Sequence, residues 1–182
     1  MSPSDHINAY PIRFIEPVVL KDRTLIQLRP IHPIDSNQAE AFRGKLSSKS
    51  IYDRFLGYVP KISSKLIERL TNIDYTKEMA IVAEVQHKKE KEVIAVGRIA
   101  GEQSAGADIA VIIADDWQGK GLGSILTNYM IDVAEEMKYE KVYSTVFAHN
   151  TRMLEILRHR GFSIRIEEYN IRYAELILTT TN

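Results

Sequence analysis

The sequence contains no cysteine. Disulfide bonds, cysteine nucleophiles and thiolate metal sites are therefore excluded, and the composition fits a reducing compartment. The chain also has no excess of charge of either sign, because 24 Lys and Arg residues balance 24 Asp and Glu residues. A balanced charge gives no global attraction to nucleic acid or to an anionic membrane. We therefore expect neither kind of partner.

Long hydrophobic runs are absent as well. No apolar segment approaches the roughly 18 residues that a membrane-spanning helix requires. The N-terminal segment MSPSDHINAYPIRF is polar, contains two prolines and has no apolar centre, so it does not resemble a signal peptide. These features predict a cytoplasmic protein.

The remaining composition is that of an ordinary folded domain. The chain has 182 residues, of which 45% are hydrophobic and 26% charged, so it can bury a core of its own. We expect an irregular lead-in over residues 1–20 and a single domain over residues 21–180, because no repeat or linker divides the sequence. A chain of this kind is expected to be a monomer or a homodimer.

Hydrophobic periodicity predicts an α/β fold with a mixed sheet and helices on both faces. Asp35 with Gln38 resembles a capping box at the first helix, and Gly161 is expected to end the last one. The charged run 87–92 is expected to be a solvated hairpin loop. Strands are expected over 24–29, 79–85, 93–99, 107–114, 141–147, 163–167 and 170–178, and helices over 35–46, 50–56, 63–71, 121–137 and 151–160.

Glycine is scarce, yet three of the nine glycines stand close together at positions 119, 121 and 123. They fall between an expected strand and the most regular amphipathic helix of the chain, over residues 121–137. Glycine lets the backbone adopt positive φ and approach a ligand closely. Successive N–H groups at a helix N-terminus also attract an anion. The segment therefore predicts a turn that binds a diphosphate.

Two common phosphate-binding motifs do not fit this turn. A P-loop needs Ser or Thr directly after its Gly-Lys pair, but Lys120 is followed by Gly121. A dinucleotide fingerprint that starts at Gly119 needs glycine or alanine where Ser124 stands, and it needs an acidic residue at the end of the next strand. Residues 145–147 contain none.

The pattern Gln118-x-x-Gly121-x-Gly123 resembles the acyl-CoA-binding signature of the Gcn5-related N-acetyltransferase (GNAT) family. The order of elements on both sides agrees. The resemblance implies a GNAT fold, a mostly antiparallel sheet that splays at a bulge, with acetyl-CoA as cosubstrate. The alternative is a glycine-rich turn that only shapes a loop. The implied cofactor residues are Ile112, Ile113 and Ala114 for the pantetheine arm, and Gln118, Gly119, Lys120, Gly121, Leu122, Gly123 and Ser124 for the diphosphate.

A second segment carries the same resemblance. Asn150-x-x-Met153 followed by Gly161-Phe162 resembles the family segment in which an asparagine contacts the pantetheine region. Asparagine is also a favoured helix N-cap, and the two roles are compatible.

Most of the chain from about residue 10 resembles one branch of the family, the Pat-type protein lysine acetyltransferases. That branch acetylates an active-site lysine of acetyl-CoA synthetase and related enzymes, and many members carry an additional regulatory domain. These 182 residues show no such domain, so the chain is either a stand-alone member or a piece of a longer protein. The resembling segments are Tyr10-Pro11, Leu20-Lys-Asp22, Leu28-Arg-Pro-Ile31 with Asp35, Ser50-Ile-Tyr-Asp-Arg-Phe55, Ile73-Asp-Tyr75, Glu78-Met-Ala80 and Asp108-Ile-Ala-Val111.

The expected chemistry is direct attack of an amine on the thioester, assisted by a carboxylate base. The resemblance assigns the base to Asp108, where Pat-type enzymes carry a glutamate, so the shorter side chain acts directly or through a water molecule. A purely structural Asp108 is the alternative, and Glu78 and Glu84 are further candidates for the base. The reaction needs no metal, and the histidines show no metal-binding spacing.

The acceptor side and the leaving group are less defined by the sequence. Many family members place a tyrosine acid at the position of Leu157, so Ser124, His149 and His159 are alternatives. A thiol with a pKa near 8.5 can also leave unaided. Three acceptor classes stay open: a protein lysine, a small amine, and none at all in a module that only senses acyl-CoA. Residues expected near the acceptor are Tyr52, Arg54 and Glu78.

Overall fold

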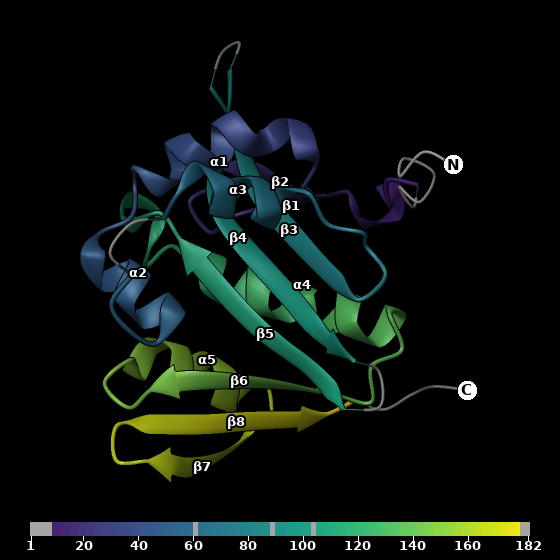
Figure 1. Ribbon diagram of the computed structural model, residues 1–182. Coiled ribbons are helices and arrows are strands. Elements are labelled where there is room, and N and C mark those ends of the chain that lie inside the picture. The colour runs from purple at the N-terminus through teal and green to yellow at the C-terminus, as the bar shows by residue number, and fades with distance from the viewer. Residues whose placement is uncertain (1–8, 60–61, 88–89, 103–104, 179–182) are drawn as a thin grey trace.

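The computed structural model describes residues 9–59, 62–87, 90–102 and 105–178, which form a layered α/β structure (Figure 1). Its sheet has eight strands in the order β1-β2-β3-β4-β5-β6-β8-β7, and only the β5–β6 pair is parallel. The expected mixed, mostly antiparallel sheet is confirmed. The strands are β1 (Glu16–Val19), β2 (Leu25–Pro30), β3 (Glu78–His87), β4 (Glu90–Glu102), β5 (Gly106–Ile113), β6 (Lys141–Phe147), β7 (Ser163–Glu168) and β8 (Ile171–Ile177).

Helices cover both faces of the sheet, as expected. On one face, α4 and α5 pack on a core that contains Leu126, Met130 and Leu157. On the other face, α1 packs on a smaller core through Phe42, and α3 lies beside α1 (Figure 1). The helices are α1 (Ser36–Arg43), α2 (Ser48–Phe55), α3 (Ser64–Thr71), α4 (Leu122–Glu136) and α5 (Thr151–His159), with 3-10 turns η1 (Ile12–Phe14), η2 (Pro33–Asp35) and η3 (Asp115–Trp117).

The N-terminal segment differs from the irregular lead-in expected over residues 1–20. Residues 1–8 lie outside the described part of the chain, but η1 and β1 follow them. β1 pairs antiparallel with β2, and Phe14 and Leu20 are buried in the α4 side of the core. A strand of four residues that contains Pro17 has too little local signal to be recognised without its partner strand.

Two further expectations are corrected. β3 and β4 continue into the charged run, so that His87 pairs with Glu90 and only residues 88–89, which are not described, separate them. At the first helix, Asp35 and Gln38 form no capping box. The side chain of His32 accepts from the backbone of this turn instead, and the carboxylate of Asp35 binds the His32 N–H and Arg29.

The β5–β6 pair holds only at its beginning. Ala107 pairs with Val142 and Asp108 with Tyr143, although β5 continues to Ile113. The two strands then part, which is visible in Figure 1 as a widening angle between them. The register between β4 and β5 is unbroken, so the bulge expected in β5 is absent from that pairing. The expected splay is therefore present without the expected bulge.

Close packing sets the position of α4 against the sheet. A Cβ atom on Gly97 of β4 would lie 2.7 Å from Cγ of Met130 and 3.1 Å from Cγ of Leu126. Both are side chains of α4, so a larger residue at position 97 would force these side chains to move. The first turn of α4 thereby lies at the end of β5.

A buried ion network fixes the start of α1 to the sheet. Arg29 on β2 donates to Asp35 at 2.7 Å and to Glu84 on β3 at 2.9 Å, and both carboxylates are almost fully buried. Lys91 gives Glu84 a second cationic partner at 2.6 Å. Charges that have lost their hydration in this way depend on their partners.

Removal of the shared cation should therefore be costly. We expect Arg29→Ala to lower the free energy of unfolding by about 3–5 kcal/mol, because two buried carboxylates lose their common partner. Urea unfolding followed by circular dichroism measures this. Arg69→Ala, on the exposed surface of α3, is the matched control and should change stability by at most about 0.5 kcal/mol. Equal midpoints for the two variants would show that the network contributes little.

Candidate active site

The parting of β5 and β6 leaves part of the β5 backbone without a neighbouring strand. The Ala114 N–H donates to Ile94 of β4 at 2.9 Å, and hydrogen-bonding direction alternates along an antiparallel strand. The backbone groups of Ile112 and Ala114 therefore face β4, whereas those of Val111 and Ile113 face the gap toward β6. Of the three residues expected to pair with a pantetheine arm, only Ile113 offers its backbone there, and Val111 joins it.

The glycine turn that follows β5 has the backbone geometry expected of an anion-binding loop. Gly119 and Gly121 have φ of +78° and +86°, and no atom lies within 4 Å of a Cβ added to either. These positions are therefore open to a ligand and conformationally suited to glycine. Gly123 serves packing instead, because its Cβ would contact Ile156 of α5 and Ile113 at 3.2 and 3.3 Å.

The N-terminus of α4 is not capped by a side chain. Its N-cap is Gly121, which has none, so the first-turn N–H groups stay available to an anion. Leu122 is buried in the core and can offer only its backbone, and Ser124 is half-buried. The exposed Lys120 carries its ammonium 4.4 Å from the ring centre of Trp117, which itself packs against both cores. This set of donors fits a diphosphate.

The side chain of Gln118 has a different surrounding from the one expected for a phosphate ligand. It donates to Ser50 of α2 at 3.0 Å, to Asp115 at 3.2 Å and to the Ile113 carbonyl at 3.3 Å. Asp115 also accepts from the Ser50 hydroxyl at 2.7 Å and the Ser47 N–H at 3.2 Å. Gln118 and Asp115 thus fasten the start of α2 to the glycine turn.

Asp115 was not recognised from the sequence, because its partners are far away along the chain. Burial alone would raise its pKa, but the hydrogen bonds from Ser47 and Ser50 outweigh burial and lower the pKa. An ionised Asp115 is therefore the form that holds α2.

Asp108 lies at the point where the two strands part. Its side chain is exposed, and its same-face neighbours across β4 and along β5 are the small Ala100 and Ala110. Even so, nearby protein atoms displace enough water to raise the pKa of this carboxyl, and the positive charge of Arg54 opposes that rise. No hydrogen bond or ion pair joins Asp108 to another described residue, so its carboxylate is available to a ligand.

The other two candidate bases are already occupied. Glu78 of β3 forms an ion pair with Arg98 at 2.7 Å, and Arg98 also donates to the Leu70 carbonyl. Glu84 is only 2% exposed and belongs to the Arg29 network. Among the three carboxylates, Asp108 is the one that is exposed and unpaired.

Helix α2 reaches from the glycine turn to the end of β6. The ring of Tyr52 stacks on Phe147 of β6 with 4.9 Å between centroids, and Phe147 stacks on His149 at 5.2 Å. The carboxylate of Asp53 accepts a hydrogen bond from Nε2 of His149 at 2.8 Å. This bridge from α2 to β6 spans the two diverging strands, and sequence reasoning did not find it, since Asp53 and His149 are 96 residues apart along the chain.

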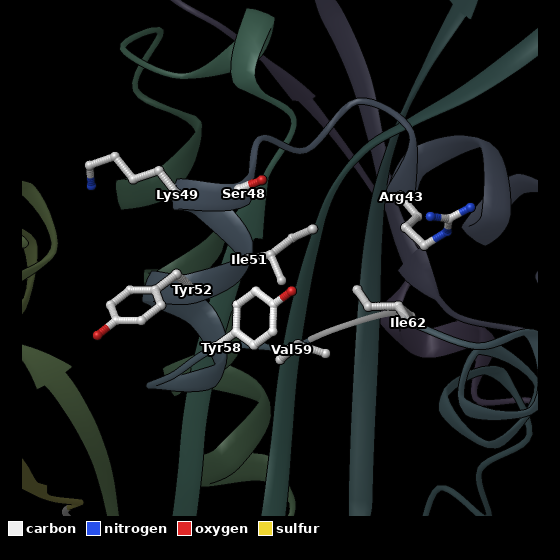
Figure 2. Close-up of a pocket in the computed structure, with 8 residues that line it drawn as sticks. All are labelled: Arg43, Ser48, Lys49, Ile51, Tyr52, Tyr58, Val59 and Ile62. Carbon is white, nitrogen blue, oxygen red and sulfur yellow. The ribbon is translucent and has the colours of Figure 1, made fainter.

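A pocket of about 470 Å³ opens on another side of α2, between that helix, α1 and the segment that follows α2 (Figure 2). It contains neither Asp108 nor the glycine turn. It is lined by Arg43, Ser48, Lys49, Ile51, Tyr52, Tyr58, Val59 and Ile62.

The second cofactor segment is built as a helix start. The side chain of Asn150 accepts a hydrogen bond from the Met153 N–H at 3.2 Å, so the N-cap role is confirmed. Leu157 is fully buried, and the ring of His159 bonds to the Glu155 carbonyl at 2.7 Å. Gly161 follows α5 with φ of +84°, as expected.

Neither a cluster of metal ligands nor a membrane-spanning helix occurs among the described residues. No three His, Asp or Glu side chains in that part of the chain gather as metal ligands. Within the same part, no helix has both the length and the apolar character needed to cross a membrane.

Comparison with known proteins gives consistent matches. The model of the Acetyltransferase (GNAT) family matches residues 49–162. Acetyltransferase PA5475 of Pseudomonas aeruginosa is 34% identical over 144 residues, which cover 79% of this chain and 77% of that protein. Acetyltransferase Pat of Mycolicibacterium smegmatis is 30% identical over 81% of this chain, but the match covers only 45% of that longer protein.

A solved structure agrees over nearly its whole length. The crystal structure of the GNAT domain of S. lividans PAT superimposes with a TM-score of 0.83 at 26% identity, covering 93% of this chain and 99% of that one. Since a family model matches more than half of its length and a relative is 34% identical to it, the chain belongs to the GNAT family and is an acetyl-CoA-dependent N-acetyltransferase.

Proposed function

We propose that the acceptor is a protein lysine, of the kind found in acyl-CoA synthetases, and that Asp108 is the catalytic base. The observation that carries the proposal is the exposed, unpaired carboxylate of Asp108 where β5 and β6 part. Support for a protein acceptor comes from the similarity to the Pat proteins and from the residues quoted above for that branch.

A surface suited to a macromolecule adjoins α2. The end of α2 and the segment after it expose four large hydrophobic side chains, and Tyr58 among them is 82% exposed. Aromatic and aliphatic side chains that gather on a surface favour contact with another protein. A small amine would leave this surface unused. The four are Tyr52, Phe55, Leu56 and Tyr58.

Acetyl-CoA is proposed to lie along the gap between the strands. The N–H groups at Gly119–Ser124 would hold the diphosphate, assisted by the α4 dipole and Lys120. The outward backbone groups of Val111 and the N–H of Ile113 would pair with the pantetheine amides. The thioester would then face Asp108, and backbone N–H groups of β5 would stabilise the oxyanion that forms during attack.

The base overcomes the protonation of the acceptor. A lysine amine with a pKa near 10.4 is neutral about once in 2,500 molecules at pH 7. Removing its proton costs about 4–5 kcal/mol, and a positioned base contributes a factor of about 10²–10⁴ in rate. The raised pKa of Asp108 makes its ionised carboxylate a stronger base than an ordinary aspartate.

Departure of the CoA thiolate is proposed to need no acid. Leu157, at the position of the tyrosine in many relatives, is fully buried. His149 and His159 are hydrogen-bonded to Asp53 and to the Glu155 carbonyl. A thiol with a pKa near 8.5 leaves readily as the anion at neutral pH.

The first test measures thiol release from acetyl-CoA with a purified acyl-CoA synthetase as acceptor. We expect wild-type turnover, and a loss of about 10²–10⁴-fold in kcat with Asp108→Asn, because only the proton transfer is removed. Calorimetry should show unchanged binding of acetyl-CoA. Asp132→Asn, which changes an exposed carboxylate of α4, is the control. Glu84→Gln is unsuitable for this purpose, because Glu84 belongs to the buried Arg29 network.

Three results would contradict the proposal. Turnover with a polyamine or an amino acid but not with the synthetase would exclude a protein lysine as the acceptor. Equal turnover with the wild-type synthetase and with a variant whose active-site lysine is replaced by arginine would exclude that lysine as the acceptor. Full activity of Asp108→Asn would exclude the base.

The raised pKa of Asp108 gives a prediction about stability. The folded state holds this proton at pH values where the unfolded chain has released it, so ionisation of Asp108 opposes folding. The cost develops as pH rises from the unfolded pKa to the folded one, and stays constant above it. Asp108→Asn should therefore melt higher than wild type at pH 7, and the difference should vanish at a pH below both values. Differential scanning calorimetry across this range measures it, and a difference independent of pH would contradict the stated cause.

The glycine turn is tested by binding. Gly121→Ala places a side chain at φ of +86°, which costs about 1–2 kcal/mol in the left-handed region. Because the turn must adopt this strained conformation to bind the diphosphate, affinity for acetyl-CoA should fall about five- to thirtyfold in calorimetry. Gly57→Ala is the control, because that site is open and has no positive φ. Equal affinity of the two variants would show that the turn does not hold the diphosphate.

A further inference from the structure

Arg54 is exceptional among the arginines that the structure describes. Its side chain is partly buried, yet it forms no hydrogen bond or ion pair with any described residue, and its Cζ lies 5.2 Å from the centre of the Phe55 ring. Every other partly buried arginine of the described chain is bonded to a carboxylate or a backbone carbonyl. These are Arg29, Arg43, Arg98 and Arg172.

An unpaired guanidinium in such a place is costly. It has five N–H donors and loses part of its hydration when it is buried. Burial is also the largest influence on its pKa, which is lowered. A carboxylate or phosphate of a bound ligand would supply the missing hydrogen-bond partners of Arg54, because arginine binds these groups with two parallel hydrogen bonds.

The position of Arg54 is fixed by the two fastenings of α2. At the start of the helix, Ser47 and Ser50 are bonded to Asp115, and farther along, Asp53 is bonded to His149. α2 packs on β5, and the charge of Arg54 acts on Asp108 of that strand. The two charges nevertheless form no ion pair. Arg54 therefore lies near Asp108 and is not neutralised by it.

The diphosphate of the cofactor is the wrong partner for this cation. Arg54 lies one helical turn beyond Ser50, the residue that touches the glycine turn, which is a rise of about 6 Å. Asp108 is five residues before Ile113 on an extended strand, about 16 Å from the end that leads into the turn. The glycine turn also has its own donors in the α4 N-terminus and Lys120.

We propose that Arg54 binds a carboxylate that stands beside the acetylated amine, so that the acceptor is a lysine flanked by Asp or Glu. Asp108 receives the ammonium of the lysine, and Arg54 receives the neighbouring carboxylate. This pairs both charges with opposite charges of the substrate at the same time. The inference rests on the proposed protein-lysine acceptor, and it adds the sequence that surrounds the lysine.

The experiment compares three peptides that differ only in the residues on either side of one lysine: Glu, Gln or Lys. With saturating acetyl-CoA, wild type should show a kcat/KM about ten- to hundredfold higher for the Glu peptide than for the Gln peptide, the range for a hydrogen-bonded charge. Arg54→Gln should lose this preference, and Arg54→Glu should favour the Lys peptide. Arg54→Lys should retain part of the preference, because it keeps the charge but not the two-pronged geometry.

Arg69→Gln, which changes an exposed arginine of α3, is the matched control and should keep the wild-type preference. Unchanged melting temperature and unchanged acetyl-CoA binding show that the Arg54 variants are folded. Equal use of all three peptides by wild type would overturn the inference and leave the lysine acceptor standing. Acetylation of small amines, with no acetylation of any peptide or of an acyl-CoA synthetase, would overturn the proposed function itself. A preference that persists in Arg54→Gln would assign the selectivity to another residue and overturn the role of Arg54.

Discussion

The separation of β5 from β6 after two residue pairs is the constraint on which the site depends. A parallel pair that continued would satisfy the β5 backbone and leave nothing for a ligand. Since the strands part, the outward groups of Val111 and the N–H of Ile113 need other partners, and a substrate that carries amides can supply them. The same separation exposes Asp108 at the apex of the gap. In the proposed arrangement, cofactor and acceptor meet at this one strand.

Helix α2 lies across the gap between β5 and β6. It is bonded to the glycine turn through Asp115 and to the end of β6 through His149, so it crosses from one diverging strand to the other. A short helix of eight residues would be marginally stable alone. Its order therefore depends on these contacts.

What the sequence could predict was local. The glycine turn, α4 and the N-cap Asn150 depend on residues near one another in the chain, and all three were found. The strand β1, the capping of η2 and the partners of Gln118 depend on contacts between distant segments, and each was missed or misassigned. Asp108 came from the family resemblance, and periodicity alone would not separate it from Glu84. The structure separates them, because burial and pairing differ although the residue types do not.

Two groups of charges in this chain have different roles. The Arg29 network stabilises the fold, whereas Arg54 and Asp108 are free to bind a substrate. Arg29 is saturated by two buried carboxylates, so it holds elements together and has nothing left to offer a ligand. Arg54 and Asp108 influence one another's ionisation without bonding. Had they joined, the base would be neutralised by its neighbour, and its pKa would fall. Their separation keeps the carboxylate basic and the guanidinium unsatisfied, and a substrate with both charges is the simplest partner for the two.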